Sequence, residues 1–285
     1  MMRVEFVKMH GAGNDFVVVD RRTFVPLSGE ATVASFVRAA CDRRTGIGAD
    51  GVLFLDPANE TGLDFAMRYY NRDGGEADLC GNGGRCLAAF AAARGFGSEG
   101  RVVFRTPAGR HEARVNGGRV DLVLGDVAPP RLGVTLATPT GGVSGALVRV
   151  GVPHFVVPVT DVGAVDLLAF APVLRGHPDL GPDGANVDIV EPTGRDRARL
   201  RTFERGVEGE TLACGTGAAA SAIALVAAEM LEAPVTLDVA SGDRLTVSFE
   251  RTETLYRAVT LSGPVHVSFE GVFHWDGADR TPSAP

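Results

Sequence analysis

Two cysteines stand directly before glycine-rich segments, in "DLCGNGGRC" at Cys80 and in "LACGTGAAAS" at Cys214. The glycines let the backbone approach a bound group closely. Because an apolar run follows each segment, we expect both cysteines at the start of a helix, where backbone N–H groups and the helix dipole favour an anion. This position predicts a thiol pKa below the usual value of about 8.5. It also predicts a cradle for a carboxylate or phosphate.

Two such units placed face to face would suit a two-base reaction. One thiolate removes the α-proton of an amino acid, and the opposite thiol returns a proton from the other face, which inverts the stereocentre. The developing enediolate must then be held by preorganised donors in a site closed to water. The two helix starts would supply such donors, so the pattern predicts a racemase or epimerase with its site between two similar halves.

The other candidate chemistries fit the sequence less well. Cys86 lies six positions after Cys80, about 240° round a helix, so the two do not form a zinc pair, and we expect Cys41 and Cys86 to be structural. The segment "GTGAAA" is a degenerate dinucleotide fingerprint, but the polar "ERGVEGETLAC" precedes it where a strand is required. The single lysine, Lys8, lies in an expected strand, which disfavours pyridoxal phosphate. We therefore expect no metal and no cofactor.

The elements that must position the cysteines are mostly strands. Short alternating or apolar runs such as "RVEFVKMH", "FVVVD", "RLRTFE" and "RLTVSF" are separated by Gly, Pro, Asp and Ser turns. Helices are expected near residues 31–42, 83–95 and 217–231. Between Ala218 and Ala228 only Ser221 is polar, and a helix that is apolar on every side is buried. Strands must therefore wrap it.

The order of features repeats along the chain. The segment around Phe16 corresponds to the segment around Phe155, and a glutamate, Glu76 or Glu210, stands four places before each cysteine. A domain-scale duplication follows. We predict an α+β fold with two pseudo-symmetric domains, 1–130 and 131–263, each a mostly antiparallel sheet around a central buried helix. The C-terminal strands within 264–285 are candidates for the first domain, and the sequence leaves their sheet open.

Composition excludes several classes of partner. The chain of 285 residues is 45% hydrophobic and carries a net charge of −7 without blocks of like charge, so neither nucleic acid nor an anionic membrane is an expected partner. No stretch approaches the roughly 18 apolar residues of a membrane span, and the start does not read as a signal peptide. Four cysteines are too sparse for a disulfide scaffold. We expect a cytoplasmic protein with reduced thiols.

Several motifs, in order and along nearly the whole chain, strongly resemble the diaminopimelate epimerase family. They are "MHGAGNDF", "GIGADG", "NRDGGEADLCGNGGRC", the Pro153–His154 pair, "NVD" and "ERGVEGETLACGTGA". The cysteine motifs alone would also admit proline racemase and its relatives. The resemblance implies a sheet rolled around a central helix in each domain. It further implies a homodimer and a cofactor-independent interconversion of LL- and meso-diaminopimelate for lysine and peptidoglycan synthesis.

The resemblance also implies a role for each matching residue. Cys80 and Cys214 resemble the acid/base pair of the family. The residues that match its carboxylate cradle are Gly81, Asn82, Gly215 and Thr216. The residues that match its other substrate-binding positions are Asn14, Asn71, Asn186, Glu204 and Arg205. His154 and Glu204 match residues that position the reacting amino group, although a packed strand-end histidine is an alternative for His154. Arginine suits a carboxylate, and Asn and Glu oxygens suit an ammonium.

Two positions depart from the pattern. The family commonly has Asn where this chain has Val152, and often Gln where it has Gly51, so two polar partners near the substrate are missing. Either the chain compensates elsewhere or its specificity at the distal end has changed. The alternatives are a racemase or epimerase of proline, hydroxyproline or another amino acid, and, more remotely, a non-catalytic small-molecule binding protein of the same fold. A substrate with a small ring, such as proline, would leave the polar side chains of four residues unpaired, which costs binding free energy. These residues are Asn14, Asn71, Asn186 and Arg205. Binding alone would need neither thiol.

Overall fold

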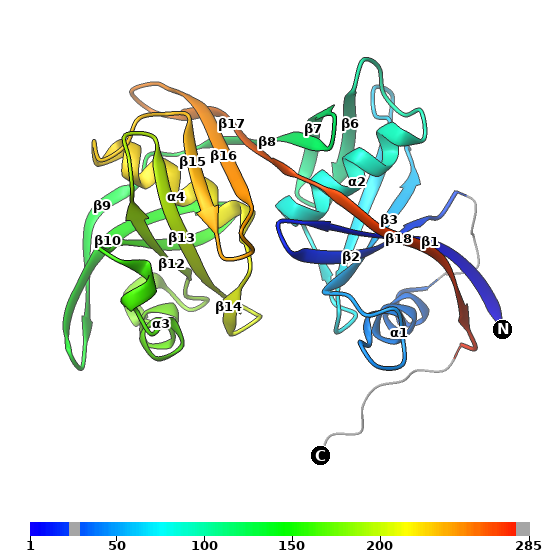
Figure 1. Cartoon of the computed structure of the whole chain (residues 1–285), viewed down its shortest axis with the longest axis horizontal. Coiled ribbons are helices and arrows are strands. Elements are labelled where there is room, and N and C mark those ends of the chain that lie inside the picture. The colour runs from blue at the N-terminus through cyan, green and yellow to red at the C-terminus, as the bar shows by residue number, and fades with distance from the viewer. Residues whose placement is uncertain (23–28, 278–285) are drawn as a thin grey trace. The chain divides into compact units, whose positions relative to one another are not determined.

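The computed structural model describes residues 1–22 and 29–277, which form two compact units (Figure 1). The first comprises residues 1–122 together with the segment that follows residue 264, and the second comprises residues 123–264. The chain leaves the first unit inside strand β8 (Arg119–Val127), somewhat before the predicted boundary at residue 130. It returns between Pro264 and Val265, where the sequence had left the assignment of the C-terminal strands open.

The sheet of the first unit is mainly antiparallel. Strand β1 (Met2–Gly11) lies between β18 (His266–Trp275) and β2 (Asn14–Asp20) and is antiparallel to both. β2 is parallel to β3 (Gly51–Pro57), and β3 is antiparallel to β4 (Phe65–Asn71). β4 pairs with the short β5 (Glu76–Ala77) and, in parallel, with β6 (Arg101–Thr106), which pairs with β7 (Gly109–Asn116).

The second unit repeats this plan strand for strand. β10 (Gly141–Val150) lies between β9 (Arg131–Thr138) and β11 (Val152–Pro158), antiparallel to both. β11 is parallel to β12 (Asn186–Pro192), which is antiparallel to β13 (Arg197–Glu204). β13 pairs with β14 (Gly209–Thr211) and, in parallel, with β15 (Val235–Val239). β16 (Arg244–Arg251) and β17 (Tyr256–Pro264) complete the series.

Each parallel pair requires a crossover, and a helix supplies it. In the first unit, α1 (Glu30–Cys41) joins β2 to β3, and α2 (Gly81–Ala93) lies between β5 and β6. In the second unit, α3 (Leu167–Arg175) and α4 (Gly215–Ala227) take the same places. The described residues also include two short 3-10 turns, Val162–Ala164 and Pro178–Leu180, on either side of α3.

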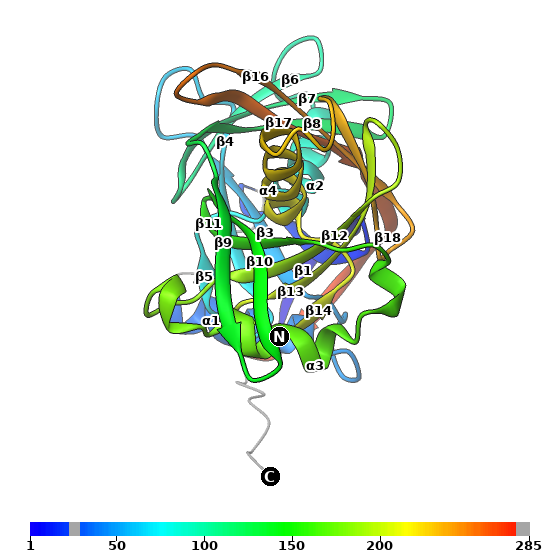
Figure 2. The ribbon, with the colours of Figure 1, turned by 90° about the vertical axis from the view of Figure 1, so that its left-hand side faces the viewer.

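The helices that follow the two cysteines are the central ones. α2 contacts β1, β2, β3, β4, β6 and β7, and α4 contacts β10, β11, β12, β13, β16 and β17. Figure 2 shows α4 among the strands of its own unit. Ser221 in α4 is fully buried, in agreement with the apolar character of this helix on every side. The predicted α+β fold, with a sheet rolled around a central helix in each half, is therefore confirmed.

Helix α3 was not expected from the sequence. Its nine residues carry Pro172, a residue that usually ends helices, and its signal is a cap in which Asp166 accepts a hydrogen bond from the Ala169 N–H at 3.2 Å. Leu167, Ala171 and Leu174 bury one face against the outer side of the second sheet. Packing thus stabilises a helix whose local propensity is poor.

The strand β18 occupies in the first unit the place that β9 has in the second. Its register with β1 runs from Met2 opposite Trp275 to His10 opposite His266. Trp275 is buried against α1, where it meets Phe36 edge to face with ring centroids 5.5 Å apart. Within residues 1–22 and 29–277, no helix is both long and apolar enough to cross a membrane.

Candidate active site

Cys80 forms the N-cap of α2. Its backbone is extended, and its Sγ accepts a hydrogen bond from the Gly83 N–H at 3.4 Å. A side chain at Gly83 would meet the Leu53 Cδ2 atom at 2.9 Å, so glycine keeps this first turn close to β3. The Cys80 side chain is only half-buried. The thiol therefore lies at the start of α2, as the sequence predicted, and it is partly exposed.

Asn14 brings the β1–β2 turn to this thiol. The motif "HGAGND" forms that turn, in which Ala12 and Gly13 both adopt positive φ angles. The Asn14 Oδ1 atom lies 3.5 Å from Cys80 Sγ and 3.5 Å from Asn82 Nδ2. Asn82 is itself held by Arg85, which donates to its Oδ1 at 2.9 Å. The first unit thus brings together Cys80, Asn82 and Asn14.

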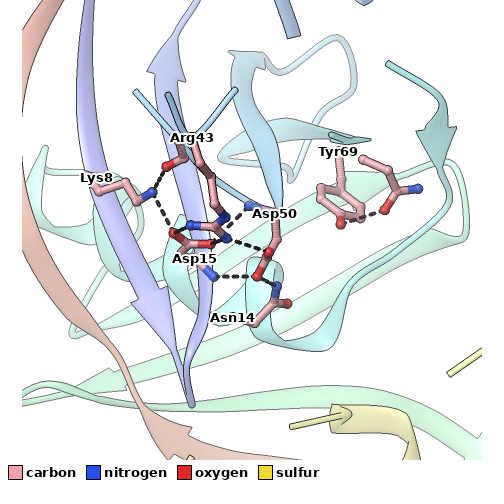
Figure 3. A network of polar contacts seen from close by, with 8 residues as sticks. Lys8, Asn14, Asp15, Arg43, Asp50 and Tyr69 are labelled. Atoms are coloured by element: carbon pink, nitrogen blue, oxygen red, sulfur yellow. Dashed lines mark hydrogen bonds and ion pairs between the residues drawn. The ribbon is translucent and has the colours of Figure 1, made fainter. Parts of the chain in front are cut away.

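A charged network fixes Asn14 from behind (Figure 3). Asn14 Nδ2 donates to Asp50 at 2.8 Å, so its carbonyl oxygen is turned toward the thiol. Arg43 bridges Asp50 and Asp15 at 2.8 and 2.9 Å, and Lys8 donates to Asp15 at 2.7 Å. Burial alone would raise the pKa of Asp15, but the hydrogen bonds from Arg43 and Lys8 outweigh it and lower that pKa to about 2.

Asn71 lies apart from this group at the end of β4, and its side chain is exposed. Its Oδ1 accepts a hydrogen bond from the Tyr69 hydroxyl at 2.7 Å, which Figure 3 also shows. Across the sheet, Asn71 is the register partner of Gly51 in β3. Asn71 is therefore oriented by β4 itself.

Cys214 forms the N-cap of α4 in the same way that Cys80 caps α2. Its Sγ accepts from the Gly217 N–H at 3.4 Å and lies 3.4 Å from the Thr216 hydroxyl. In contrast to Cys80, Cys214 is buried, at 7% exposure. The two caps share their backbone geometry but differ in solvation.

The pKa of Cys214 contradicts our prediction that a helix start lowers it. Burial raises this pKa well above the usual value, and the nearby Glu204 and Asp188 carboxylates add to the rise. The hydrogen bond from the Gly217 N–H and the contact with the Thr216 hydroxyl act in the opposite direction but are smaller. Desolvation of the sulfur therefore outweighs the helix dipole and favours the protonated thiol at Cys214.

A buried polar chain runs away from Cys214. The Thr216 Oγ1 atom lies 3.0 Å from His154 Nε2, and His154 Nδ1 lies 2.7 Å from Asp188. Asp188 also accepts from the Thr202 hydroxyl at 2.7 Å, and both His154 and Asp188 are fully buried. The His154 Nδ1 can donate to the Asp188 carboxyl group, and in that tautomer of the neutral ring Nε2 accepts from the Thr216 hydroxyl. His154 is therefore both packed in β11 and hydrogen-bonded to the first turn of α4.

The remaining predicted residues of the second unit surround this chain. Asn186 Nδ2 lies 3.4 Å from His154 Nε2, and Asn186 Oδ1 accepts from the Arg205 N–H at 2.7 Å. Burial raises the pKa of Glu204, whose carboxylate accepts from Thr211 at 2.6 Å. The second unit thus gathers its predicted residues around one helix start, including Gly215 and Thr216 in the first turn of α4.

The other two cysteines lie away from the helix starts. Burial raises the pKa values of Cys41 and Cys86 to about 12. Cys86 is fully buried inside α2, and Cys41 ends α1 in the outer core. In the described part of the chain, no cluster of three His, Cys, Asp or Glu side chains has the arrangement of a metal site.

Sequence reasoning missed four residues that support the predicted ones: Asp50, Tyr69, Arg85 and Asp188. Asp50 and Asp188 belong to the motifs "GIGADG" and "NVD", so their place in these motifs was a signal that could have identified them. Arg85 is fully buried although charged, which sequence does not reveal. Tyr69 has no signal beyond its place two residues before Asn71. Val152, the other departure, begins β11 opposite Val150.

Comparison with known proteins shows which family the chain resembles. The family model for diaminopimelate epimerase matches residues 6–127 and 146–267. The diaminopimelate epimerase of Aquifex aeolicus is 41% identical over 276 residues, covering 94% of this chain and 97% of its own length. The diaminopimelate epimerase of Methanocella arvoryzae is 39% identical over 282 residues, covering 95% and 97%.

Solved structures share the fold at low identity. A hydroxyproline epimerase from Agrobacterium vitis, with trans-4-hydroxy-L-proline bound, superposes with a TM-score of 0.72 at 19% identity, covering 98% of this chain and 93% of its own. A probable proline racemase from Agrobacterium radiobacter gives 0.71 at 19%, covering 97% and 94%. These structural likenesses concern the fold alone, whereas the sequence matches above are to diaminopimelate epimerases. Both halves of the chain carry a cysteine cap, and the family model matches both halves. The chain therefore belongs to the diaminopimelate epimerase family.

Proposed function

We propose that this protein is an isomerase that interconverts LL- and meso-diaminopimelate without a cofactor, in lysine and peptidoglycan biosynthesis. The observation that carries the proposal is the pair of equivalent helix caps. Cys80 and Cys214 each precede a 13-residue central helix, and each accepts a hydrogen bond from the N–H of the glycine three residues later. Family membership supplies the substrate.

In the proposed reaction, a thiolate takes the α-proton of the substrate, so a C–H bond breaks and an S–H bond forms. The electron pair passes into the carboxylate as an enediolate. The opposite thiol then gives its proton to the other face of the α-carbon, where a C–H bond forms and a thiolate remains. N–H groups of the first turns, at Gly81 and Asn82 and at Gly215 and Thr216, are the proposed donors to the carboxylate.

The second unit favours Cys214 as the proton donor in the resting enzyme. Thr216 donates its hydroxyl proton to His154 Nε2, so its oxygen is available to accept the Cys214 S–H. The raised pKa of Cys214 has the same consequence.

The side chains around the caps suit an amino-acid substrate. Asn14 lies beside the Cys80 thiol and Asn82 lies beside Asn14, whereas Glu204 lies near Cys214 and Asn186 contacts His154. Glu204 and the amide oxygens accept from an ammonium group, and Arg205 donates to a carboxylate. We place His154 in a positioning role through Thr216.

Location and assembly are part of the same proposal. A thiol/thiolate pair requires both cysteines reduced, which the cytoplasm maintains, so we place the protein there. We also propose a homodimer. The apolar side chains exposed on β18, namely Val267, Phe269 and Val272, are suited to such an interface. Sedimentation of wild type and Phe269→Ser would test the dimer, and an unchanged dimer in the variant would remove β18 from the interface.

The first test follows proton exchange by NMR with LL-diaminopimelate in D2O, using reduced protein without added cofactor. We expect deuterium at the α-carbon together with formation of the meso isomer. Cys80→Ala and Cys214→Ala are expected to abolish epimerisation. Cys86→Ala, which changes a buried cysteine in the same helix as Cys80, is the matched control and should retain it.

Parallel samples with proline and hydroxyproline would separate the main alternative. Inversion of the α-carbon of proline or hydroxyproline, with diaminopimelate unchanged, would replace the proposed substrate and retain the two-thiol chemistry. A folded, reduced protein that binds diaminopimelate without any exchange would instead support a binding protein. Activity retained in both cysteine variants would refute the two-base mechanism.

A further inference from the structure

Gly51 and Tyr69 share one space between β3 and β4. A Cβ atom on Gly51 would lie 2.6 Å from Tyr69 Cε2 and 3.3 Å from Cζ, and it would also overlap the Tyr70 carbonyl oxygen. The φ angle of Gly51 is not positive, so the conformation does not require glycine. Glycine stands here because the β4 backbone and the Tyr69 ring occupy the space of a side chain.

The Tyr69 ring is fixed in that place. It is 8% exposed, and it meets Phe16 edge to face with ring centroids 5.9 Å apart and planes at 80°. Its hydroxyl donates to Asn71 Oδ1 at 2.7 Å. Residues i and i+2 of a strand lie on one face, so Tyr69 and Asn71 are neighbours on the same side of β4. A rigid ring thus presents a donor to the exposed amide.

This contact decides which end of Asn71 faces a ligand. An exposed asparagine amide presents either oxygen or nitrogen, because rotation by about 180° exchanges the two. With its oxygen bound to Tyr69, Asn71 directs its N–H donors outward, and their complement is a carboxylate oxygen. An ammonium group, which needs an acceptor, would not bind this face of the amide.

We propose that Tyr69, whose ring fills the space beside Gly51, is a positioning residue that sets Asn71 as the donor to a substrate carboxylate. The inference rests on the proposed function, since it assigns one carboxylate of the amino-acid substrate to Asn71. It also accounts for the departure at residue 51. The polar group missing from β3 is supplied by the tyrosine hydroxyl of the neighbouring strand.

The test is Tyr69→Phe, which keeps the ring and removes the hydroxyl. We expect the KM for diaminopimelate to rise about fivefold, as for loss of one neutral hydrogen bond, with kcat changed less than about twofold. Tyr70→Phe is the matched control. Tyr70 is the next residue of the same strand, but its side chain packs in the core cluster that includes Phe36 and Trp275. The KM of the Tyr70→Phe variant should therefore stay at the wild-type value.

A double-mutant cycle distinguishes positioning through Asn71 from a structural effect of the ring. In an Asn71→Ala background, Tyr69→Phe should leave KM unchanged, because the amide that it orients is gone. Equal KM effects of Tyr69→Phe with and without Asn71 would overturn the inference, as would a wild-type KM in the single variant. A wild-type protein without turnover of diaminopimelate would refute the proposed function instead.

Discussion

Gly217 and Gly83 occupy the same position in the two cysteine motifs, so replacing each by alanine is a matched pair of perturbations. Both donate their N–H to the capping thiol at 3.4 Å. The added methyl groups would meet different neighbours. At Gly217 the methyl overlaps the buried carboxylate of Asp188 and lies 3.2 Å from the Thr202 hydroxyl. At Gly83 it meets the terminal methyl of Leu53 at 2.9 Å.

The Asp188 carboxylate cannot retract without loss, because its oxygens are held by His154 and Thr202 at 2.7 Å each. Weakening one hydrogen bond to a charged group costs about 1.5–3 kcal/mol. Overpacking adds about 1–3 kcal/mol, and the higher helix propensity of alanine offsets at most about 1 kcal/mol. The Gly217→Ala variant should therefore lose about 2–4 kcal/mol of unfolding free energy.

The methyl group at Gly83 would meet the end of an apolar side chain, which can shift without breaking a hydrogen bond, so Gly83→Ala should stay within about 1 kcal/mol of wild type. Urea unfolding of both variants, followed by far-UV circular dichroism, measures the difference. The reasoning is refuted if Gly217→Ala is as stable as Gly83→Ala. It is also refuted if Gly217→Ala is destabilised but Asp188→Ala does not relieve the additional cost.

Three further predictions follow from the charges and burial at the site. Asp188→Asn should lower kcat about tenfold or more in steady-state assays, because His154 loses the carboxylate that fixes its tautomer. An unchanged kcat would contradict the positioning role of His154 through Thr216. Iodoacetamide should modify Cys80 before Cys214 in the substrate-free protein, since Cys214 is buried and protonated; peptide mapping by mass spectrometry that finds Cys214 first would contradict this. The lowered pKa of Asp15, about 2, contributes about 2 kcal/mol of stability that is present above about pH 4 and lost as pH falls toward 2. The difference in unfolding free energy between wild type and Asp15→Asn should shrink over that range, and a constant difference would contradict it.

Local signals explain why so much of the fold was visible in the sequence. The glycines after Cys80 and Cys214 and the apolar runs beyond them identify both central helices, which begin directly after each cysteine. The repeat of Phe16 and Phe155 predicts two similar sheets, and these segments are the equivalent strands β2 and β11. Helix α3 was not predicted because its stability comes from packing against the outer side of a sheet rather than from the helix propensity of its residues.

The sequence by itself determined that two capped cysteines begin two buried helices in a duplicated chain, because capping and periodicity act over a few neighbouring residues. Tertiary structure decided how each cysteine is solvated, since burial and the Glu204 and Asp188 carboxylates reverse the effect of the helix start at Cys214. It also decided that Tyr69 fills the space above Gly51 and orients Asn71. Desolvation and side-chain orientation depend on neighbours brought from distant parts of the chain, which spacing along the sequence does not specify.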